Sequence, residues 1–324
     1  MADALLEIDD LAVSFSGLRG DVQVLDGISF HVGHGEIVGL VGESGSGKSV
    51  TAFSTIRLLG PQGRIDRGQI RFDGTDLTMM SEPGMSQVRG RDISMIFQEP
   101  MTSLNPVFTI GLQIAEVLQE HLGLGRKDAY ASAIELLDKV GIPAPQDRID
   151  DYPHQMSGGM RQRVMIAMAL ACQPRLLIAD EPTTALDVTI QAQILDLLRQ
   201  LQRDSDMSIL LITHDFGIIA DITDRVIVMY AGQVVEEAKV DDLFQSPLHP
   251  YSGLLMKSIP TVGERRAKLP VIEGSAPAAT AFPSGCRFHD RCPMAQDKCR
   301  VDAPVLAPCG DGRRVRCWFA GETP

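Results

Sequence analysis

The sequence lacks any hydrophobic run long enough to cross a membrane, and it has few aromatic residues. A membrane-spanning helix needs about 20 consecutive apolar residues, and the longest apolar candidate, Val164–Cys172, is far shorter. Aromatic residues make up 5% of the chain, with a single tryptophan, Trp318. The opening residues, MADALLEIDD, are acidic and do not have the basic start of a secretory signal. We therefore expect a cytoplasmic protein that reaches a membrane only through a partner subunit.

Positive charge is also scarce. The 324 residues include 42 acidic and 30 basic side chains, which gives a formal net charge of −12. Such a surface repels nucleic acid and anionic lipid on average, so a role in nucleic-acid binding is disfavoured. Hydrophobic residues make up 44% and charged residues 22% of the chain, as in soluble globular proteins. The length suffices for one large domain or two modest ones.

The cysteines are unevenly distributed. Cys172 stands alone in an apolar stretch with a helical pattern. The last 39 residues contain the other five, namely Cys286, Cys292, Cys299, Cys309 and Cys317. In a cytosolic chain such clustering favours metal binding over disulfides.

Short apolar segments alternate with helical patterns along most of the chain, which predicts an α/β fold. The expected strands are residues 5–8, 11–15, 28–32, 35–41, 69–72, 93–97, 176–179, 208–213, 226–230 and 233–236. The expected helices start at residue 49 and cover residues 109–122, 128–140 and 190–203. Beyond residues 248–251, where we place a domain boundary, the composition changes, and residues 274–283 are typical of a linker.

The segment GESGSGKS at residues 42–49 fits the P-loop pattern, and it follows an apolar strand and opens a helix, as that motif requires. Its glycines let backbone N–H groups converge on a phosphate, and the helix N-terminus adds the positive end of a dipole. Lys48 would neutralise the charge of the β- and γ-phosphates, and Ser49 would offer its hydroxyl to Mg²⁺. The alternative, a chance glycine-rich turn, explains neither the Lys-Ser pair nor the strand and helix.

The segment LLIADE at residues 176–181 is an apolar strand that ends in two carboxylates. Asp180 would hold Mg²⁺ through water, and Glu181 would polarise the attacking water as a general base. Acidic strand ends are common, so the segment alone has little specificity. Together with the P-loop it predicts ATP hydrolysis.

The segment MSGGMRQR at residues 156–163 resembles the signature motif of the ABC (ATP-binding cassette) family, usually written LSGGQ. In that family this helix N-terminus faces the γ-phosphate bound by the opposite subunit of a dimer. Met156 and Met160 replace the usual Leu and Gln. We interpret Met160 as a subfamily variant, because Ser157 and backbone N–H groups contact the phosphate.

The resemblance covers about residues 5–245 and implies a P-loop NTPase ABC cassette, with a RecA-like core, an antiparallel β subdomain and an inserted α-helical subdomain. It implies a nucleotide-binding domain at residues 1–250, with the helical subdomain at about 99–170, and an extension at 251–324. Two subunits of such a pair close on two ATP molecules, and hydrolysis opens them again.

Four further positions match the family in order. Gln98 resembles the Q-loop glutamine, which reaches the metal and the attacking water, and residues 185–187 (ALD) resemble the D-loop. His214 resembles the switch histidine that binds the γ-phosphate, and Phe15 stands where an aromatic residue stacks on adenine. Taken singly, Gln98 could be a surface residue, His214 a structural residue and Phe15 a core residue. Their joint order favours the functional interpretation.

The resemblance therefore implies a complete set of site residues. The nucleotide-binding residues are Phe15, Gly42, Ser44, Gly45, Gly47, Lys48, Ser49, Val50, Ser157, Gly158, Gly159, Asp180 and Asp187. The catalytic residues are Glu181, His214 and Gln98, and Mg²⁺ is held by Ser49, Gln98 and Asp180.

Three segments are similar to the ATPases of oligopeptide and dipeptide permeases, a group that includes nickel importers. They are FQEPMTSLNP at residues 97–106, SGGMRQRVMIAMAL at 157–170 and SPLHPY at 246–251. This similarity implies a peripheral subunit on the cytoplasmic face of the inner membrane that powers import of peptides or a related small solute. Its partners would be a second ATPase, either identical or homologous, two membrane permease subunits and an extracytoplasmic binding protein. The solute is chosen by those partners.

The last 39 residues, 286–324, are called the tail below. Their spacing Cys286-x5-Cys292-x6-Cys299-x17-Cys317 matches the same subfamily, some members of which carry a [4Fe–4S] cluster there. Four thiolates also suit Zn²⁺, and reduced structural thiols are a third interpretation. Cys309 departs from the pattern and is either a fifth thiol or an alternative ligand.

Two other functions compete with transport. ABC proteins of DNA repair, chromosome maintenance or translation usually carry long coiled coils, inserted zinc modules or two fused cassettes. This sequence has one P-loop, no heptad run and an acidic composition. The second is a regulatory cassette without useful hydrolysis, against which the presence of Glu181 and His214 argues.

Overall fold

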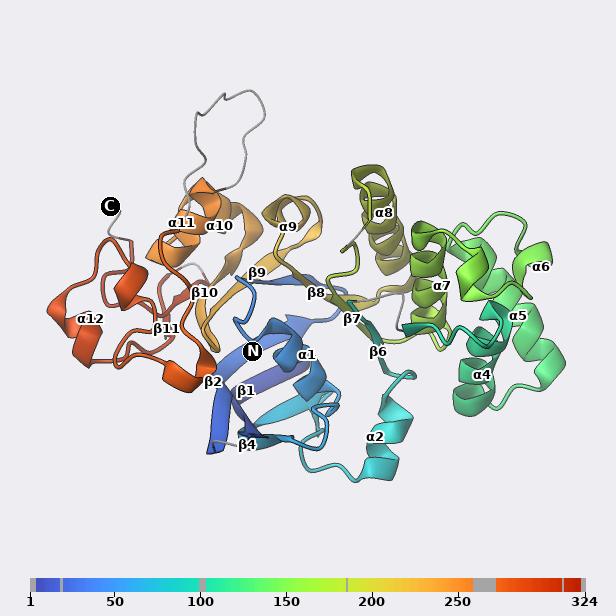
Figure 1. Cartoon of the computed structure of the whole chain (residues 1–324), viewed down its shortest axis with the longest axis horizontal. Coiled ribbons are helices and arrows are strands. Elements are labelled where there is room, and N and C mark those ends of the chain that lie inside the picture. Colours follow the sequence, from blue (N-terminus) through green and yellow to red (C-terminus); the bar gives the residue numbers. More distant parts are fainter. Residues whose placement is uncertain are drawn as a thin grey trace. The chain divides into compact units, whose positions relative to one another are not determined.

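The computed structural model describes residues 4–17, 20–98, 103–184, 186–258, 272–310 and 312–321 (Figure 1). The chain forms two compact units, and each is described by itself. Unit 1 contains residues 1–32, 37–78 and 212–324, and unit 2 contains residues 33–36 and 79–211. Residues 212–324 thus belong to the same unit as the N-terminal strands.

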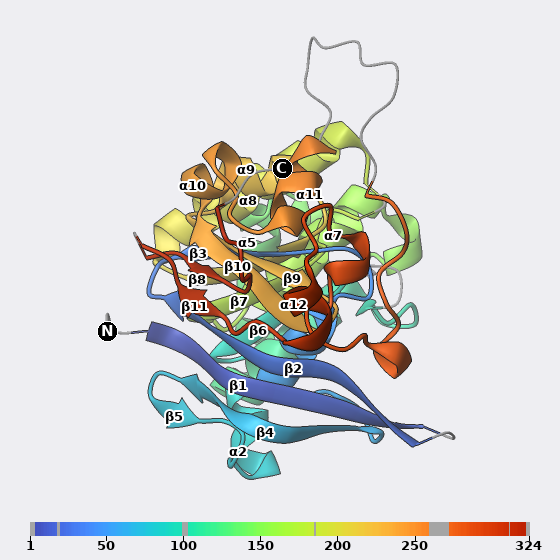
Figure 2. The same ribbon diagram turned by 90° about the vertical axis from the view of Figure 1, so that its left-hand side faces the viewer.

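One sheet of unit 1 has the strand order β2–β1–β4–β5 (Figure 2). Its strands are β1 (Ala4–Gly17), β2 (Gly20–Gly33), β4 (Gly63–Phe72) and β5 (Thr75–Asp76). The predicted turn at Asp73-Gly74 joins β4 to β5, with φ values of 48° and 76° that match the twist of a tight hairpin. The two strands expected at residues 5–8 and 11–15 form one strand. A bulge between Asp9 and Ala12 interrupts its pairing with β4 and produces the break in the hydrophobic pattern.

The second sheet of unit 1 carries the P-loop segment. Its strands run in the order β11–β12–β10–β9–β3. They are β3 (Ile37–Val41), β9 (Arg225–Tyr230), β10 (Gln233–Lys239), β11 (Ala307–Pro308) and β12 (Arg314–Val315). β3 is buried along its whole length and pairs in parallel with β9, from Val38 opposite Arg225 to Val41 opposite Val228. The predicted hairpin at Ala231-Gly232 joins β9 to β10, which pair antiparallel.

The helices of unit 1 are α1 (Lys48–Thr55), α9 (Phe216–Ile222), α10 (Val240–Gln245), α11 (Pro250–Lys257) and α12 (Asp297–Val301). Short 3-10 turns lie at η2 (Ala279–Ala281), within the predicted linker, and at η3 (His289–Arg291). The tail extends the sheet, because β12 pairs antiparallel with β10, with Glu236 opposite Val315.

A buried aromatic cluster fixes the tail to the strands of unit 1. Phe288, from the tail, is 1% exposed and packs against Tyr230 of β9 and Tyr251 of α11, with ring centroids 5.1 and 5.3 Å apart. His249 caps α11 by accepting the Tyr251 N–H at 3.1 Å, and Pro250 begins the helix. Burial lowers the pKa of His249 to about 3, so the imidazole is neutral. The SPLHPY segment is therefore a helix start whose side chains contact the tail.

Buried charges of β10 are paired with arginines of the tail. The Glu236 carboxylate, fully buried, accepts the N–H groups of Leu248 and His249 at 2.8 Å each and pairs with Arg313 at 2.9 Å. Glu237 pairs with Arg314 and with Arg225. Each buried carboxylate thus has a cationic partner, as burial of a charge requires.

Unit 2 combines strands β6 and β7 and most of β8 with a helical group. The strand order is β8–β7–β6 for β6 (Ile93–Ile96), β7 (Leu176–Asp180) and β8 (Ser208–Thr213), whose first four residues belong to this unit. β6 and β7 pair in parallel, from Ile93 opposite Leu176 to Ile96 opposite Ala179. The helices are α2 (Glu82–Val88), α4 (Ile110–Leu122), α5 (Arg126–Lys139), α6 (Pro145–Arg148), α7 (Gly158–Leu170) and α8 (Val188–Ser205), with the 3-10 turn η1 (Pro153–Gln155).

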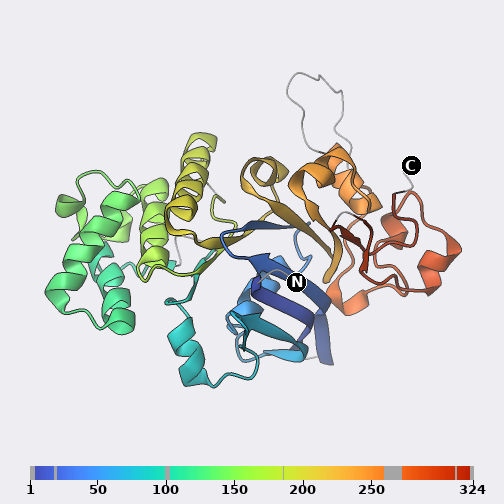
Figure 3. The ribbon, with the colours of Figure 1, turned by 180° about the vertical axis from the view of Figure 1, so that it is seen from behind.

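Helices α4, α5 and α7 pack against one another in the group predicted at residues 99–170 (Figure 3). The first residues of that range, 99–102, lie outside the described part of the chain. Thr109 begins α4 by accepting the Leu112 N–H at 3.3 Å, and Gly123 ends it with φ of 66°. Among the helices in the described ranges, none has the length and apolar character to cross a membrane.

Replacing Phe288 with alanine should lower the free energy of unfolding of the full chain by about 3 kcal/mol or more, because it removes the centre of the aromatic cluster. Val301→Ala is the control, since Val301 is 76% exposed and should change stability by less than about 0.5 kcal/mol. Urea unfolding followed by circular dichroism measures both. A Phe288→Ala variant as stable as Val301→Ala would show that the tail does not contribute to the core.

Candidate functional site

The P-loop follows β3 and leads into α1, as the sequence predicts. Gly42 has φ of 153°, and a Cβ atom there would lie 2.2 Å from the Met229 carbonyl oxygen. Gly47 has φ of 103°, and a Cβ atom there would lie 2.5 Å from Leu25 Cδ2. Both positions therefore require glycine, since any side chain would displace the backbone of β9 or the core beside β2.

The Lys48 side chain folds back onto the backbone of the P-loop. Lys48 is 6% exposed, and its Nζ donates to the carbonyl oxygens of Gly42 at 2.8 Å and Glu43 at 3.1 Å. The Ser46 N–H donates to the same Glu43 oxygen at 3.1 Å. The ammonium group is thus held at the loop by two backbone acceptors.

The start of α1 has the properties of an anion site. Gly47 is its N-cap and offers no side-chain acceptor, so no side chain caps the first N–H groups of the helix. Ser44 and Gly45 are exposed, while Ser49 and Val50 are half-buried in the first turn. Uncapped amides beside a lysine suit a phosphate group, and the Ser49 hydroxyl is a suitable oxygen ligand for Mg²⁺.

Phe15, the predicted adenine-stacking residue, lies near the end of β1 and is half-buried. It stands opposite Gly63 of β4 in the strand register. A Cβ atom on Gly63 would lie 2.9 Å from Phe15 Cε1, so the ring edge approaches the glycine closely. Phe15 and the P-loop both belong to unit 1.

In unit 2, Asp180 ends the fully buried strand β7 and is 2% exposed. Glu181 follows with φ of 47°, a left-handed conformation that is uncommon for residues other than glycine. The Thr184 N–H donates to the Glu181 carbonyl at 3.1 Å and closes a turn that holds this conformation. At Glu181 the backbone therefore leaves the direction of β7.

The Glu181 carboxylate is oriented by two donors. Gln98 Nε2 donates to Oε2 at 3.0 Å, and Thr184 Oγ1 donates to the same oxygen at 2.9 Å. The structure thus brings Gln98 and Glu181 together, although they are separated by 83 positions in the sequence. Thr184 is not among the site residues that the sequence motifs predict. Its position three residues after the carboxylate is the signal that could have found it.

The signature segment forms a helix N-terminus, as predicted. Ser157 is the N-cap of α7 and accepts the Met160 N–H at 3.3 Å. Ser157 and Gly158 are exposed. Gly159 packs on α8, where a Cβ atom would lie 2.8 Å from Ile190 Cγ2. The helix end is therefore accessible to a ligand from outside unit 2.

Asp187 is the exposed N-cap of α8 and accepts the Ile190 N–H at 3.0 Å. Ala185, the first residue of the predicted D-loop, lies outside the described residues. His214, in unit 1, is exposed at the end of β8. The next residue, Asp215, caps α9 by accepting the Gly217 N–H at 2.7 Å.

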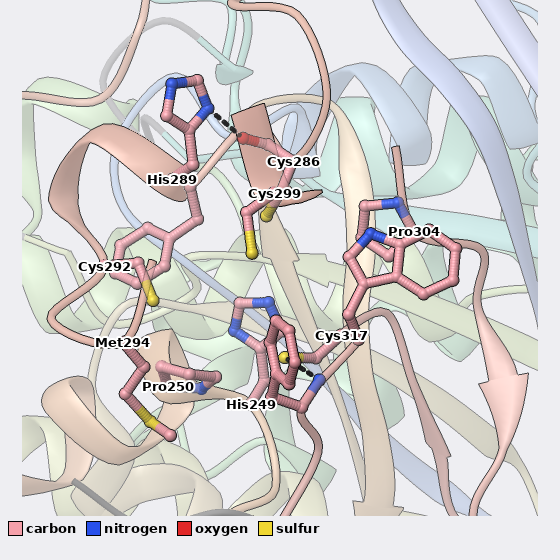
Figure 4. Close-up of a pocket in the computed structure, with 12 residues that line it drawn as sticks. His249, Pro250, Cys286, His289, Cys292, Met294, Cys299, Pro304 and Cys317 are labelled. Atoms are coloured by element: carbon pink, nitrogen blue, oxygen red, sulfur yellow. Dashed lines mark hydrogen bonds between the residues drawn. The ribbon is translucent and has the colours of Figure 1, made fainter. Parts of the chain in front are cut away.

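Four tail cysteines line one cavity of unit 1 (Figure 4). They are Cys286, Cys292, Cys299 and Cys317, and His249 and His289 also line the cavity. Burial raises the pKa of the Cys286 thiol, and its neighbours Cys299 and Cys292 add to the shift. Burial likewise raises the pKa of Cys292. Cys309 is exposed and does not line the cavity.

This gathering does not amount to a formed metal centre. Within the described ranges, no group of three or more His, Cys, Asp or Glu side chains is placed to hold a metal ion. The predicted [4Fe–4S] or Zn²⁺ site at these four cysteines is therefore not present as a preformed ligand set. All six cysteines are free thiols.

The sequence matches two protein families. Residues 25–184 match the ABC transporter family, and residues 235–299 match the family described as oligopeptide/dipeptide transporter, C-terminal region. The chain is 52% identical over 98% of its length to the oligopeptide transport ATP-binding protein AppD of Bacillus subtilis, of which it covers 97%. It is 47% identical, again over 98% of its length, to the dipeptide transport ATP-binding protein DppD of Escherichia coli, of which it covers 97%.

Solved structures give the same fold. The ATP-binding cassette MJ0796, in a dimeric post-hydrolysis state bound to ADP and Pi, has a TM-score of 0.64 and 25% identity, covering 72% of this chain and 98% of that one. CbiO1 of Clostridium perfringens, part of the ABC transporter complex CbiONQ, has a TM-score of 0.64 and 26% identity, covering 75% of this chain and 91% of that one. The cassette fold predicted from the sequence is confirmed, and the chain belongs to the ABC transporter ATP-binding proteins of the oligopeptide/dipeptide type.

Proposed function

We propose that this chain is the ATP-hydrolysing subunit of a multisubunit ABC transporter that imports peptides or a related small solute. One observation carries the proposal. The same chain contains a P-loop whose carbonyl oxygens hold Lys48, and a Glu181 carboxylate oriented by Gln98 and Thr184. Relatives similar over nearly the whole chain are named as ATP-binding proteins of oligopeptide and dipeptide transport.

Lys48 and the uncapped amides of α1 would bind the phosphate oxygens of ATP. Ser49 and Asp180, with Gln98, would hold Mg²⁺, which neutralises charge on the phosphates when bound. Phe15 would stack on the adenine, and His214 would bind the γ-phosphate. In this proposal the exposed and half-buried residues of the P-loop contact the bound nucleotide.

Glu181 would act as the general base that orients and deprotonates the attacking water. Gln98 and Thr184 both donate to its Oε2, which fixes the orientation of the carboxylate. A carboxylate held in one orientation suits a group that must accept a proton from the attacking water.

The exposed N-termini of α7 and α8 suit a second subunit. Ser157, Gly158 and Gly159 would contact the γ-phosphate bound by the opposite ATPase, and Asp187 would contact that subunit. The second ATPase is another copy or a homologous chain. Two membrane permease subunits and an extracytoplasmic binding protein complete the transporter, which this chain would join peripherally from the cytoplasmic face.

For the tail, we propose a [4Fe–4S] cluster held by Cys286, Cys292, Cys299 and Cys317, with Zn²⁺ as the alternative. The four thiols line one cavity, and Cys309 stands apart from it. Four cysteine thiolates are the ligand set such a cluster takes.

Transport itself is tested with proteoliposomes that contain this chain, two permease subunits of the same organism and a matching binding protein. ATP-dependent peptide uptake by the wild-type assembly is the expected result. Uptake that proceeds equally without this chain would refute the proposal.

Lys48→Ala should weaken binding of Mg-ATP by about tenfold or more, because it removes the buried cation that contacts the phosphates. Titration of the full chain with a fluorescent ATP analogue measures the change. Lys127→Ala, at an exposed position of α5, is the control. Equal affinities of the two variants would contradict the assignment of the P-loop.

Glu181→Gln should retain Mg-ATP affinity but lower kcat of the assembled transporter by about a hundredfold or more, as expected for loss of a general base. Thr184→Val should produce a smaller fall in kcat with an unchanged KM, since it removes one of two orienting donors. Normal turnover by Glu181→Gln would rule out this carboxylate as the base.

Anaerobically purified wild-type protein should contain about four irons and four sulfides per chain. Cys292→Ser should lose them, whereas Cys309→Ser should retain them because Cys309 does not line the cavity. Elemental analysis and the absorbance near 400 nm report the result. One zinc per chain, or no metal, would refute the cluster.

A further inference from the structure

Glu43, the second residue of the P-loop, is bound by the tail of the same chain. Arg291 Nη1 donates to Glu43 Oε2 at 2.7 Å, and Nη2 donates to Oε1 at 3.0 Å. The two side chains are 7% and 28% exposed. A bidentate pair of this kind, largely screened from water, is among the stronger polar contacts in proteins.

Arg291 is itself fixed by its surroundings. Its Nε donates to the Glu273 carbonyl at 3.0 Å, and Nη2 also donates to the Ile272 carbonyl at 3.4 Å. Nη1 donates to Tyr230 Oη at 3.3 Å. The Glu43 carboxylate raises the pKa of Arg291 above its already high value, so the guanidinium stays charged. The ion pair therefore has one defined geometry.

Tyr251 holds the backbone of the same P-loop residue. The Glu43 N–H donates to Tyr251 Oη at 2.9 Å. Tyr251 is fully buried, and its ring packs on Tyr230 with centroids 4.7 Å apart. Burial raises the pKa of Tyr251, so the hydroxyl remains protonated and neutral. Glu43 is thus held through both its side chain and its main chain.

Glu43 also contacts Lys48 directly. The Glu43 carbonyl oxygen accepts Lys48 Nζ at 3.1 Å and the Ser46 N–H at 3.1 Å. A movement of Glu43 would therefore move an acceptor of the P-loop lysine. The connection runs from Arg291 through Glu43 to Lys48 by direct contacts.

We propose that Arg291 and Tyr251 are positioning residues of the ATP site, which set the shape of the P-loop through Glu43. The inference rests on the proposed ATP-binding function and adds to it a role for the C-terminal segment. It also assigns a role to the SPLHPY motif, whose tyrosine contacts the P-loop backbone.

The alternative is that Arg291 merely attaches the tail to the rest of unit 1. Other tail arginines do this without contacting the P-loop. Arg314 donates to the Glu237 carboxylate and to the Ser29 carbonyl at 2.7 Å. Glu237 keeps a second partner, Arg225 at 3.1 Å, if Arg314 is removed. Arg314→Ala is therefore a matched control that breaks a tail ion pair elsewhere.

The experiment measures Mg-ATP affinity and melting temperature of the full chain for Arg291→Ala and Arg314→Ala. Arg291→Ala should weaken Mg-ATP binding by about tenfold, as expected for loss of a charged hydrogen-bonded pair. Arg314→Ala should stay within about twofold of the wild type. In the assembled transporter, Arg291→Ala should raise KM for ATP with kcat retained at saturation. An unchanged affinity in Arg291→Ala, or an equal loss in Arg314→Ala, would overturn the inference.

Two milder variants keep the test valid if Arg291→Ala does not fold. Glu43→Gln preserves size and removes only the charge, and it should weaken binding similarly. Arg291→Ala added to Glu43→Gln should then cost little more, because the pair is already broken. Tyr251→Phe should weaken binding by a smaller factor, and wild-type affinity in both Glu43→Gln and Tyr251→Phe would also overturn the inference. If the wild type itself did not bind Mg-ATP, the proposed function would fail rather than this extension.

Discussion

The buried Lys48 ammonium donates to the carbonyl oxygens of Gly42 and Glu43 and so fixes the P-loop around a positive charge. It places a positive charge at the turn between β3 and α1, where the first amides of the helix have no side-chain cap. The turn is possible because Gly42 and Gly47 adopt positive φ values against β9 and the core. A strand, two glycines and one lysine thereby create a site for an anion.

The two carboxylates, Asp180 and Glu181, are also positioned by a buried strand and a turn with positive φ. A fully buried strand places Asp180 and Glu181 at its end, and a left-handed turn at Glu181 is stabilised by Thr184. Two donors on one carboxylate oxygen then fix its direction. Preorganisation of this kind lowers the cost of reaching the transition state. In both units, rigid buried strands thus hold the reactive groups at their carboxyl ends.

The P-loop and the tight turns were predictable from the sequence, because each depends on residues close together in the chain. The P-loop is defined by glycine spacing and by its strand and helix, and the turns at Asp73-Gly74 and Ala231-Gly232 are defined by residues that tolerate positive φ. Helix caps such as Ser157 and Asp187 also depend on residues within one turn. The matched families and structures confirmed the cassette fold that these signals predicted.

What the sequence could not predict depends on contacts between distant residues. Glu43 and Arg291 are 248 positions apart, and neither has a local pattern that would pair them. The bulge in β1 depends on its partner strand, and the pairing of β12 with β10 depends on the tail's return to the sheet. The clustering of the cysteines favoured metal binding and the family resemblance implied a cluster, but only the folded chain shows that four of the thiols line one cavity.

If residues 42–49 form the phosphate site, bound nucleotide should protect their backbone amides from hydrogen exchange. The full chain is labelled with and without saturating Mg-ATP, and exchange is followed by mass spectrometry in a peptide spanning the P-loop and α1. Exchange in this peptide should be slower when Mg-ATP is present, because the amides of the loop and helix start would bind phosphate oxygens. A peptide from α5, Arg126–Lys139, should be unaffected and serves as the reference. Unchanged exchange in the P-loop at saturating Mg-ATP would show that these residues do not bind the phosphates.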